Sequence, residues 1–297
     1  MNQELVTAAA AELDRSGFLP CPGESGVEFL QRFILSEEAF ADFESGMREN
    51  NAAVVFDEIK VEAPDRIPPE IIAEAAEKTR SLYGFENRRV PGFFLSGKVG
   101  ALWGGCMIGD PDNGFAMMLL RCCFRQKQKW CVYDRAELLA HELCHAMRQS
   151  LGESRLEEYF AYQTGKSFLR RNFGNCFIRE RDAVLFILPA FILLTATMIR
   201  ELGGLQFPLW PFWGFVAVYP LFLLIRNFLS MRIVRKAEKN LRRFGVDAPG
   251  PILFRSTFEE LETLGKLKDK EAFEEFRKER SQCELRWAII NSRFFDK

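Results

Sequence analysis

The segment ELLAHELCHAMRQSLGESRLEEYFAY, residues 137–162, contains both histidines of the chain. They are His141 and His145, and Glu142 lies between them. On a helix, residues four apart lie one above the other, so the two imidazoles would face the same way. At that separation they can share one zinc ion, and the glutamate can reach a water beside it. The segment therefore predicts metal-assisted hydrolysis, with Glu142 taking the proton of the water.

The flanks of this segment predict that it is helical. Asp134 precedes an apolar-periodic run and Glu137 lies three residues further on, which is a capping-box-like pattern for a helix start. Leucine, alanine and methionine side chains supply a buried stripe, and Gly152 ends the run. The expected helix covers residues 135 to about 150.

A catalytic zinc ion needs a third protein ligand and one open position. The pattern with a third histidine is absent, because Arg148 and Leu151 stand where its glycine and histidine would be. Ser154 and Glu157 form a second capping-box pattern, which predicts a new helix directly after the serine and turns Glu157 back toward the chain. Glu158 is then the expected third ligand, and Glu157 is the alternative.

The segment 134–165 resembles the gluzincin group of zinc metallopeptidases, which carry His-Glu-x-x-His on one helix and a glutamate ligand on the next. The resemblance implies that both histidines and Glu158 bind zinc and that Glu142 is the general base. In several gluzincins the glutamate begins a Glu-x-x-(Ala/Cys)-Asp pattern, whose aspartate orients a ligand histidine. Tyr162 stands at that position here, and the gap between His145 and Glu158 is short.

The same resemblance implies a fold and an activity. The expected fold is an α+β zincin-like catalytic domain, in which a small twisted sheet and a backing helix support the His-Glu-x-x-His helix and the glutamate helix. The expected activity is zinc-dependent cleavage of a peptide or protein substrate. Such a site needs a group that stabilises the tetrahedral oxyanion. Tyr162 and Tyr159 are the preferred candidates, and Arg155 is the alternative.

The residues upstream provide elements for such a domain. Pro69 opens a good helix-forming run that ends at Gly84, and this is the expected backing helix. Apolar runs predict strands at residues 53–62, 101–108, 115–124 and 130–133. The run 101–108 is the predicted edge strand, which would leave main-chain groups free to pair with an extended peptide.

Two long uncharged stretches follow, at residues 183–199 and 205–225. A bilayer core of about 30 Å needs roughly 17–25 helical residues, so each stretch can cross it. Trp210 and Trp213 suit a headgroup interface. We expect a two-helix transmembrane hairpin with the lipid bilayer as partner, and a buried hairpin in a soluble protein is the alternative.

Charge and cysteine usage give the hairpin an orientation. Basic residues lie on both of its outer flanks, whereas Arg200 in the short loop is opposed by Glu201. By the positive-inside rule, both termini and the zinc site are expected on the cytoplasmic side. The eight cysteines show no paired spacing, which agrees with free thiols in a reducing compartment. The net charge of −1 gives no indication of nucleic acid binding.

The expected organisation has four parts. They are an N-terminal helical segment (1–50), the zincin-like domain (51–180), the hairpin (183–225) and a helical C-terminal module that is first basic and then charged (226–297). A membrane-anchored peptidase is the main hypothesis, because the His-Glu-x-x-His string is intact. A non-catalytic membrane scaffold with a degenerate zincin domain is the alternative.

Overall fold

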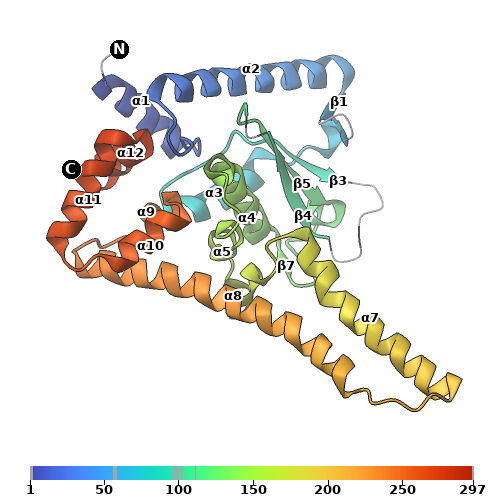
Figure 1. The fold of residues 1–297 in the computed structure, drawn as a ribbon. Helices are drawn as coiled ribbons and strands as arrows, with labels where there is room; N and C mark the ends of the chain where they lie inside the picture. Colours follow the sequence, from blue (N-terminus) through green and yellow to red (C-terminus); the bar gives the residue numbers. More distant parts are fainter. Residues whose placement is uncertain (1–2, 56–58, 96–99, 101–102, 111, 296–297) are drawn as a thin grey trace.

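Helices surround a small sheet, and one pair of long helices projects away from the rest of the molecule (Figure 1). The computed structural model describes residues 3–55, 59–95, 100, 103–110 and 112–295. Within these residues the α+β expectation is confirmed.

The central sheet consists of three strands in the order β3–β5–β4, which cover Gly92–Leu95, Ala116–Arg121 and Gly105–Gly109. β3 runs parallel to β5, whereas β4 runs antiparallel to β5. In the part of the chain that the structure describes, β4 pairs with β5 alone, so it is an edge strand, as predicted. The predicted run began at residue 101, but β4 begins at Gly105, and residues 101 and 102 lie outside the described residues.

Helices cover both faces of this sheet. On one face, Met118 of β5 belongs to the same core as α3 (Pro69–Tyr83) and α4 (Arg135–Arg148). On the other face, Met117 packs in a second cluster with α2 (Gly26–Asn50). β5 is therefore apolar along almost its whole length because neither of its faces meets water. α3 begins and ends where the sequence predicts and lies against α4.

Two of the predicted strands are wrong in form. The run 53–62, predicted as one strand, contains a separate antiparallel pair, β1 (Ala52–Val55) and β2 (Ile59–Glu62), whose connection lies outside the described residues. This pair forms its own sheet beside α2.

The run 130–133, also predicted as one strand, is divided between β6 (Lys129–Trp130) and β7 (Tyr133–Asp134). Cys131 lies between them in the left-handed region, with a φ of 52°. A single extended strand is impossible there because the chain reverses at that residue.

The projecting helices are α7 (Glu180–Gly203) and α8 (Trp210–Arg243), and both are long and apolar enough to cross a membrane. In each, only 11% of the most apolar window is buried, which weighs against a hairpin buried in a protein core. The loop predicted at residues 200–204 is largely helical, and the connection lies at 204–209. α8 also continues without a break past residue 225, where the predicted hairpin ends.

The C-terminal module returns to the part of the molecule that contains the sheet and α3. Its helices are α9 (Gly250–Arg255), α10 (Phe258–Lys266), α11 (Lys270–Cys283) and α12 (Leu285–Phe294). Extended backbone at Glu284 separates the last two. α9 contacts α3, and α12 contacts α1 (Gln3–Arg15), so the two ends of the chain lie side by side (Figure 1).

Candidate metal centre

α4 holds both histidines rigidly. Its N-cap is Asp134, as predicted, and the carboxylate accepts hydrogen bonds from the N–H groups of Ala136 and Glu137. The Glu137 side chain does not complete a capping box; it accepts a hydrogen bond from the N–H of Lys166 instead. Nearly every residue of α4 is buried, so close packing on all sides prevents the helix from rotating about its axis.

The short helix α5 (Glu157–Tyr162) carries the glutamate, but it does not begin where predicted. The helix was expected directly after Ser154, with Glu157 at its third position. In the structure Glu157 is the first helical residue, and the N-cap Leu156 makes no side-chain cap. Tertiary contacts prevail over the local pattern, since Arg155 lies over the ring of Phe258 in α10.

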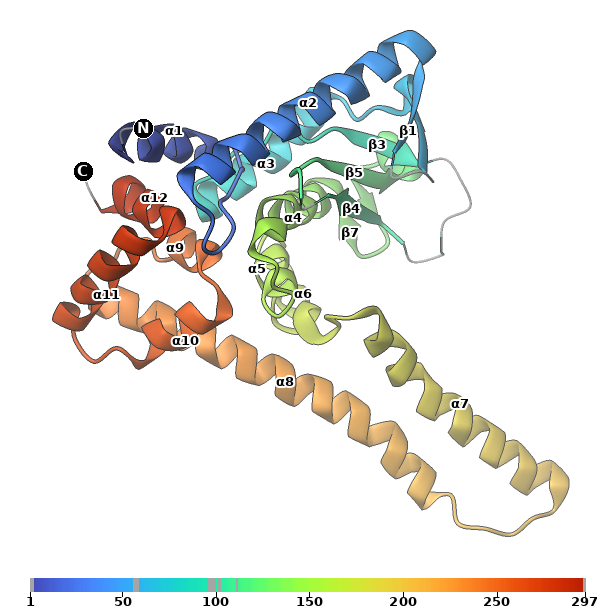
Figure 2. The ribbon, with the colours of Figure 1, turned by 45° about the horizontal axis from the view of Figure 1, so that its top comes forward.

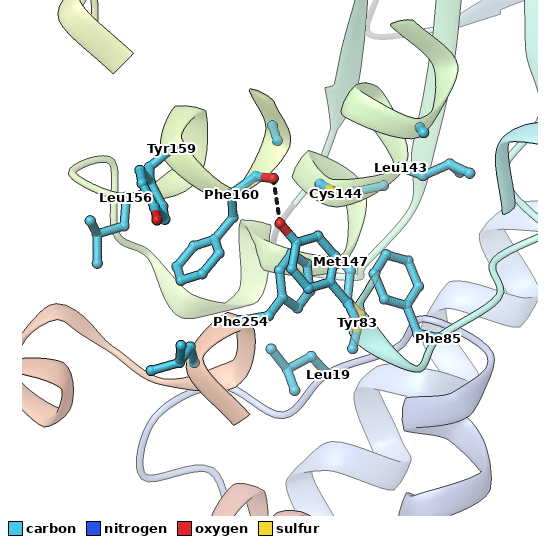
Figure 3. Packing of buried hydrophobic residues seen from close by; sticks show 14 of the residues in the cluster. Leu19, Tyr83, Phe85, Leu143, Cys144, Met147, Leu156, Tyr159, Phe160 and Phe254 are labelled. Carbon is cyan, nitrogen blue, oxygen red and sulfur yellow. Dashed lines mark hydrogen bonds between the residues drawn. The ribbon is translucent and has the colours of Figure 1, made fainter. Parts of the chain in front are cut away.

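Figure 3 shows how the core fixes α5 against the rest of the domain. The Tyr83 hydroxyl at the end of α3 donates a 2.7 Å hydrogen bond to the carbonyl of Phe160. Phe254 of α9 stacks on Tyr83 with ring centroids 4.1 Å apart, and Phe160 meets Phe254 edge-on. The opposite face of α5 is thereby directed at α4.

His141, His145 and Glu158 converge as predicted, with their donor atoms all within 4.8 Å of one another. The two Nε2 atoms are 3.1 Å apart, and each lies 3.4–3.5 Å from a Glu158 oxygen. Ligands about 2.0–2.1 Å from a tetrahedral zinc ion lie roughly 3.3 Å from one another. The three groups therefore fit around one metal ion of this kind.

Glu157, the alternative ligand, lies outside this group of donor atoms. It lines the same cavity, but among the described residues the donor set contains Glu158 and not Glu157. Burial raises the pKa of Glu157, whereas the pKa of Glu158 is lowered, because His145 and His141 outweigh the effect of burial on it. The geometry thus favours Glu158.

The two histidines have different electrostatic environments. Burial and the neighbouring His145 lower the pKa of His141 to about 3. Burial also opposes protonation of His145, but its hydrogen bond to Glu158 and the charge of that residue prevail and raise its pKa to about 9. His141 is therefore held neutral, which is the state in which an imidazole binds a metal.

Glu142 lies beside the donor group without belonging to it. It is 5% exposed, and burial raises its pKa to about 7. The backbone of Met107 in β4 and the cation of His145 act in the opposite direction and favour the ionised carboxylate. A carboxyl group of this pKa can both accept and donate a proton near neutral pH.

A cavity of about 810 Å³ opens over these groups, and the whole of β4 lines it. The N–H of Arg121 bonds to the carbonyl of Gly104, and the N–H of Asp110 bonds to the carbonyl of Phe115. Because antiparallel pairing alternates, the main-chain groups of Gly105, Met107 and Gly109 point away from β5. Within the described ranges no strand pairs with this edge, which forms one wall of the cavity, and the backbone of Met107 there interacts with Glu142.

The three candidates for oxyanion stabilisation lie in different places. Tyr162 lines the cavity, and its ring lies 4.6 Å from that of His141. Burial raises the pKa of Tyr162 to about 12, so its hydroxyl keeps its proton. Tyr159 points instead into the core (Figure 3) and does not line the cavity. Arg155 is directed at α10 and does not line it either.

Tyr162 also stands where the related pattern has an aspartate that orients a histidine. Its contact with His141 is between rings, and no hydrogen bond joins its hydroxyl to Nδ1 of His141. That nitrogen is buried and has no hydrogen-bond partner among the described residues. Tyr162 therefore does not take over the role of that aspartate toward His141.

Arg170 is a site residue that the sequence did not reveal. It belongs to α6 (Phe168–Phe173), lines the cavity, and lies over the rings of Tyr133 and Tyr162 at 5.3 and 5.5 Å. Its charge acts on both His141 and Glu142. In the sequence it is one of many basic residues before the hairpin, and no spacing relates it to the histidines.

In comparisons with protein-family models, curated proteins and solved structures, nothing matches this chain. Its function is therefore inferred from the geometry and chemistry of the site.

Proposed function

We propose that this protein is a membrane-anchored, zinc-dependent peptidase of the gluzincin type. The observation that carries the proposal is the convergence of His141, His145 and Glu158 beside the buried carboxyl of Glu142. Two imidazoles and one carboxylate are a donor set used by catalytic zinc, and they leave a fourth position open to the cavity.

The chain's own residues account for the proton transfers of peptide hydrolysis. Zinc, when bound, supplies Lewis-acid chemistry and lowers the pKa of a bound water. Glu142 takes the proton of the attacking water and then delivers it to the amine that leaves. Its carboxyl group is buried beside the donor group, where it can reach both the water and the leaving amine.

Two further features support peptide hydrolysis over other metal-assisted reactions. The free edge of β4 can pair with an extended polypeptide, which places a peptide bond along the wall of the cavity. Arg170 and the protonated hydroxyl of Tyr162 face the same cavity. They are the groups available to stabilise the negative charge that develops on the carbonyl oxygen.

The anchoring part of the proposal rests on α7 and α8. Both helices are long and apolar enough to cross a bilayer, and basic residues flank the pair on its outer sides. The positive-inside rule then places both termini and the metal centre in the cytoplasm.

Metal content and hydrolysis of the purified full-length protein test the proposal together. We expect stoichiometric zinc by elemental analysis and cleavage of a quenched-fluorescent peptide library. Glu142→Gln should retain zinc and thermal stability, but it should lower kcat by about 10²–10⁴-fold, because only proton transfer is removed. Glu49→Gln, on the exposed side of α2, is the control and should leave zinc content, thermal stability and kcat unchanged.

Protein without zinc would favour the non-catalytic scaffold. Full activity in Glu142→Gln would show that the assigned proton transfer is wrong.

A further inference from the structure

α6 carries the cavity residue Arg170 and, on other sides of the same short helix, several exposed apolar side chains. Phe168 and Leu169 are 67% and 66% exposed, and Phe173 is 46% exposed. Phe177, just beyond the helix, is also exposed. We refer to these four residues as the α6 patch. Large aromatic and aliphatic side chains gathered in this way on an exposed surface mark an interaction site.

The α6 patch is attached to the projecting helices. The Asn227 side chain of α8 donates a 2.6 Å hydrogen bond to the carbonyl of Asn172 in α6. Arg235, two turns further along α8, donates a 3.0 Å bond to the Asn172 side chain. These contacts fix α6 at the height on α8 where the uncharged stretch 205–225 has just ended.

The α6 patch is also continuous with the apolar surface of α7. The rings of Phe177 and Phe186 are 5.4 Å apart, so the exposed aromatic surface runs from the patch onto the first projecting helix. Figure 2 shows α6 between α5 and the start of α7, at the base of the projecting pair.

Charge around the α6 patch indicates what covers it. Exposed basic side chains occur in the same stretch of chain before the hairpin and on α8, namely Lys166, Arg171, Arg179, Arg181, Arg232 and Arg235. Apolar rings bordered by arginine and lysine match the interface of an anionic bilayer, where rings enter the acyl boundary and cations meet the headgroups. The bilayer crossed by α7 and α8 would lie at this height.

We infer that α6 lies in the surface of that bilayer, so that the metal centre opens at the lipid surface and takes polypeptide segments directly adjacent to a membrane. The second part rests on the proposed peptidase function. α6 joins the two parts physically, because Arg170 faces the cavity while Phe168 and Leu169 are exposed. A polypeptide held close to the headgroups would then lie beside the cavity and the edge of β4.

The position of α6 can be measured without any enzymatic activity. The full-length protein, with its own cysteines replaced, is spin-labelled at Phe168→Cys and reconstituted in vesicles of three parts phosphatidylcholine to one part phosphatidylglycerol. We expect collisions with oxygen to be more frequent, and collisions with a water-soluble nickel chelate less frequent, than at Leu35→Cys. Leu35 is the control because it is 50% exposed on α2, remote from the hairpin.

Two other results of this measurement would contradict the placement of α6 in the bilayer surface. Collision rates equal to those at Leu35 would place α6 in water. Low rates with both reagents would show that protein, either a partner or a second copy, covers the α6 patch. Phe173→Cys serves as a second labelling site, and retained zinc binding shows that a labelled variant is folded.

The substrate class is tested with one quenched peptide library linked to phosphatidylethanolamine by a short or a long polyethylene glycol spacer. We expect about tenfold faster cleavage with the short spacer, because a long spacer dilutes the peptide away from the surface. The double variant Phe168→Ser, Leu169→Ser should lose this preference. The matched variant Ile34→Ser, Leu35→Ser, at two exposed apolar residues of α2, should keep the preference.

Equal cleavage at both spacer lengths would overturn the substrate class. A further outcome is that α6 lies at lipid depth while the protein cleaves the library with neither spacer. That result would refute the peptidase function, but not the position of α6.

Discussion

His141 and His145 lie on one face of α4, yet their imidazoles differ in pKa because Glu158 hydrogen bonds to only one of them. It hydrogen bonds to His145 and raises the pKa of that imidazole to about 9, whereas burial keeps His141 neutral. A carboxylate that already binds the protonated form of one ligand is well placed to become the third ligand when a metal replaces that proton. Glu157 is one residue away but has no contact of this kind with either histidine.

This difference predicts opposite outcomes for two neighbouring substitutions. Glu158→Ala should weaken zinc binding by at least about 100-fold, above the 10–100-fold typical of residues that only orient a ligand. Glu157→Ala should weaken it by less than about tenfold, because the residue lines the cavity without joining the donor group. Competitive zinc titration against a chelator measures both. The reverse order would transfer the ligand role to Glu157.

The site residues that could be predicted from the sequence are those whose relative positions follow from their spacing along the chain. The i, i+4 spacing of the histidines is a property of the helix itself, and Glu158 lies on the next helix in the chain. Arg170 could not be found in this way. Its position depends on α6, which is held by a bond between Asn172 and Asn227, residues far apart in sequence. Such a contact leaves no local pattern.

Helix ends were also predictable where local groups determine them, and not where contacts distant in sequence do. α3 and α4 match the prediction because their ends are set by local groups, Gly84 in the left-handed region for one and the Asp134 cap for the other. The start of α5 does not match, although Ser154 and Glu157 have capping spacing. There the N–H of Phe258 bonds to Glu153, and this contact with α10 fixes the chain before α5.

β4 lies close to β5 at Gly105, and this predicts the effect of a larger side chain there on stability. A Cβ added at Gly105 would lie 2.8 Å from the backbone carbonyl oxygen of Leu119, and that atom cannot move without disturbing β5. We expect Gly105→Ala to lower the free energy of unfolding by about 1–3 kcal/mol, as for other overpacked sites. Gly46→Ala, in α2, should instead stabilise by about 0.5–1 kcal/mol, because nothing lies within 4 Å of its Cβ.

Denaturant unfolding of both variants in the same detergent checks this pair. A neutral Gly105→Ala would mean that β4 can move away from β5, and the strand edge would then be less rigid than the geometry indicates.

For the molecule as a whole, one buried acidic residue joins the two ends of the chain. Asp14, at the end of α1, is fully buried and accepts hydrogen bonds of 2.9 and 3.0 Å from Arg255 of α9. Arg293 of α12 also pairs with it. The sequence predicted helices at both ends but not this contact, because the partners lie more than two hundred residues apart.

Removing that acidic residue should leave the guanidinium groups of Arg255 and Arg293 with carbonyl partners but without an anionic one. Asp14→Ala is expected to lower the free energy of unfolding by about 3–5 kcal/mol, as when one member of a buried ion pair is lost. Glu12→Gln, which breaks the exposed pair with Arg15, should change it by less than about 0.5 kcal/mol. Equal effects of the two substitutions would show that the chain ends are not held together through Asp14.

The orientation of the hairpin is the last property of the whole molecule to be predicted. A chain that crosses the bilayer through α7 and returns through α8 must have α2 and α11 on one side and the connection 204–209 on the other. In a cysteine-free background, Leu205→Cys should react with an impermeant thiol reagent on intact cells. Ser45→Cys in α2, and a single retained Cys283 in α11, are exposed positions that should react only after lysis. Labelling of Ser45→Cys from outside would place the metal centre on the opposite face, and release of the protein by carbonate would show that α7 and α8 do not cross the membrane.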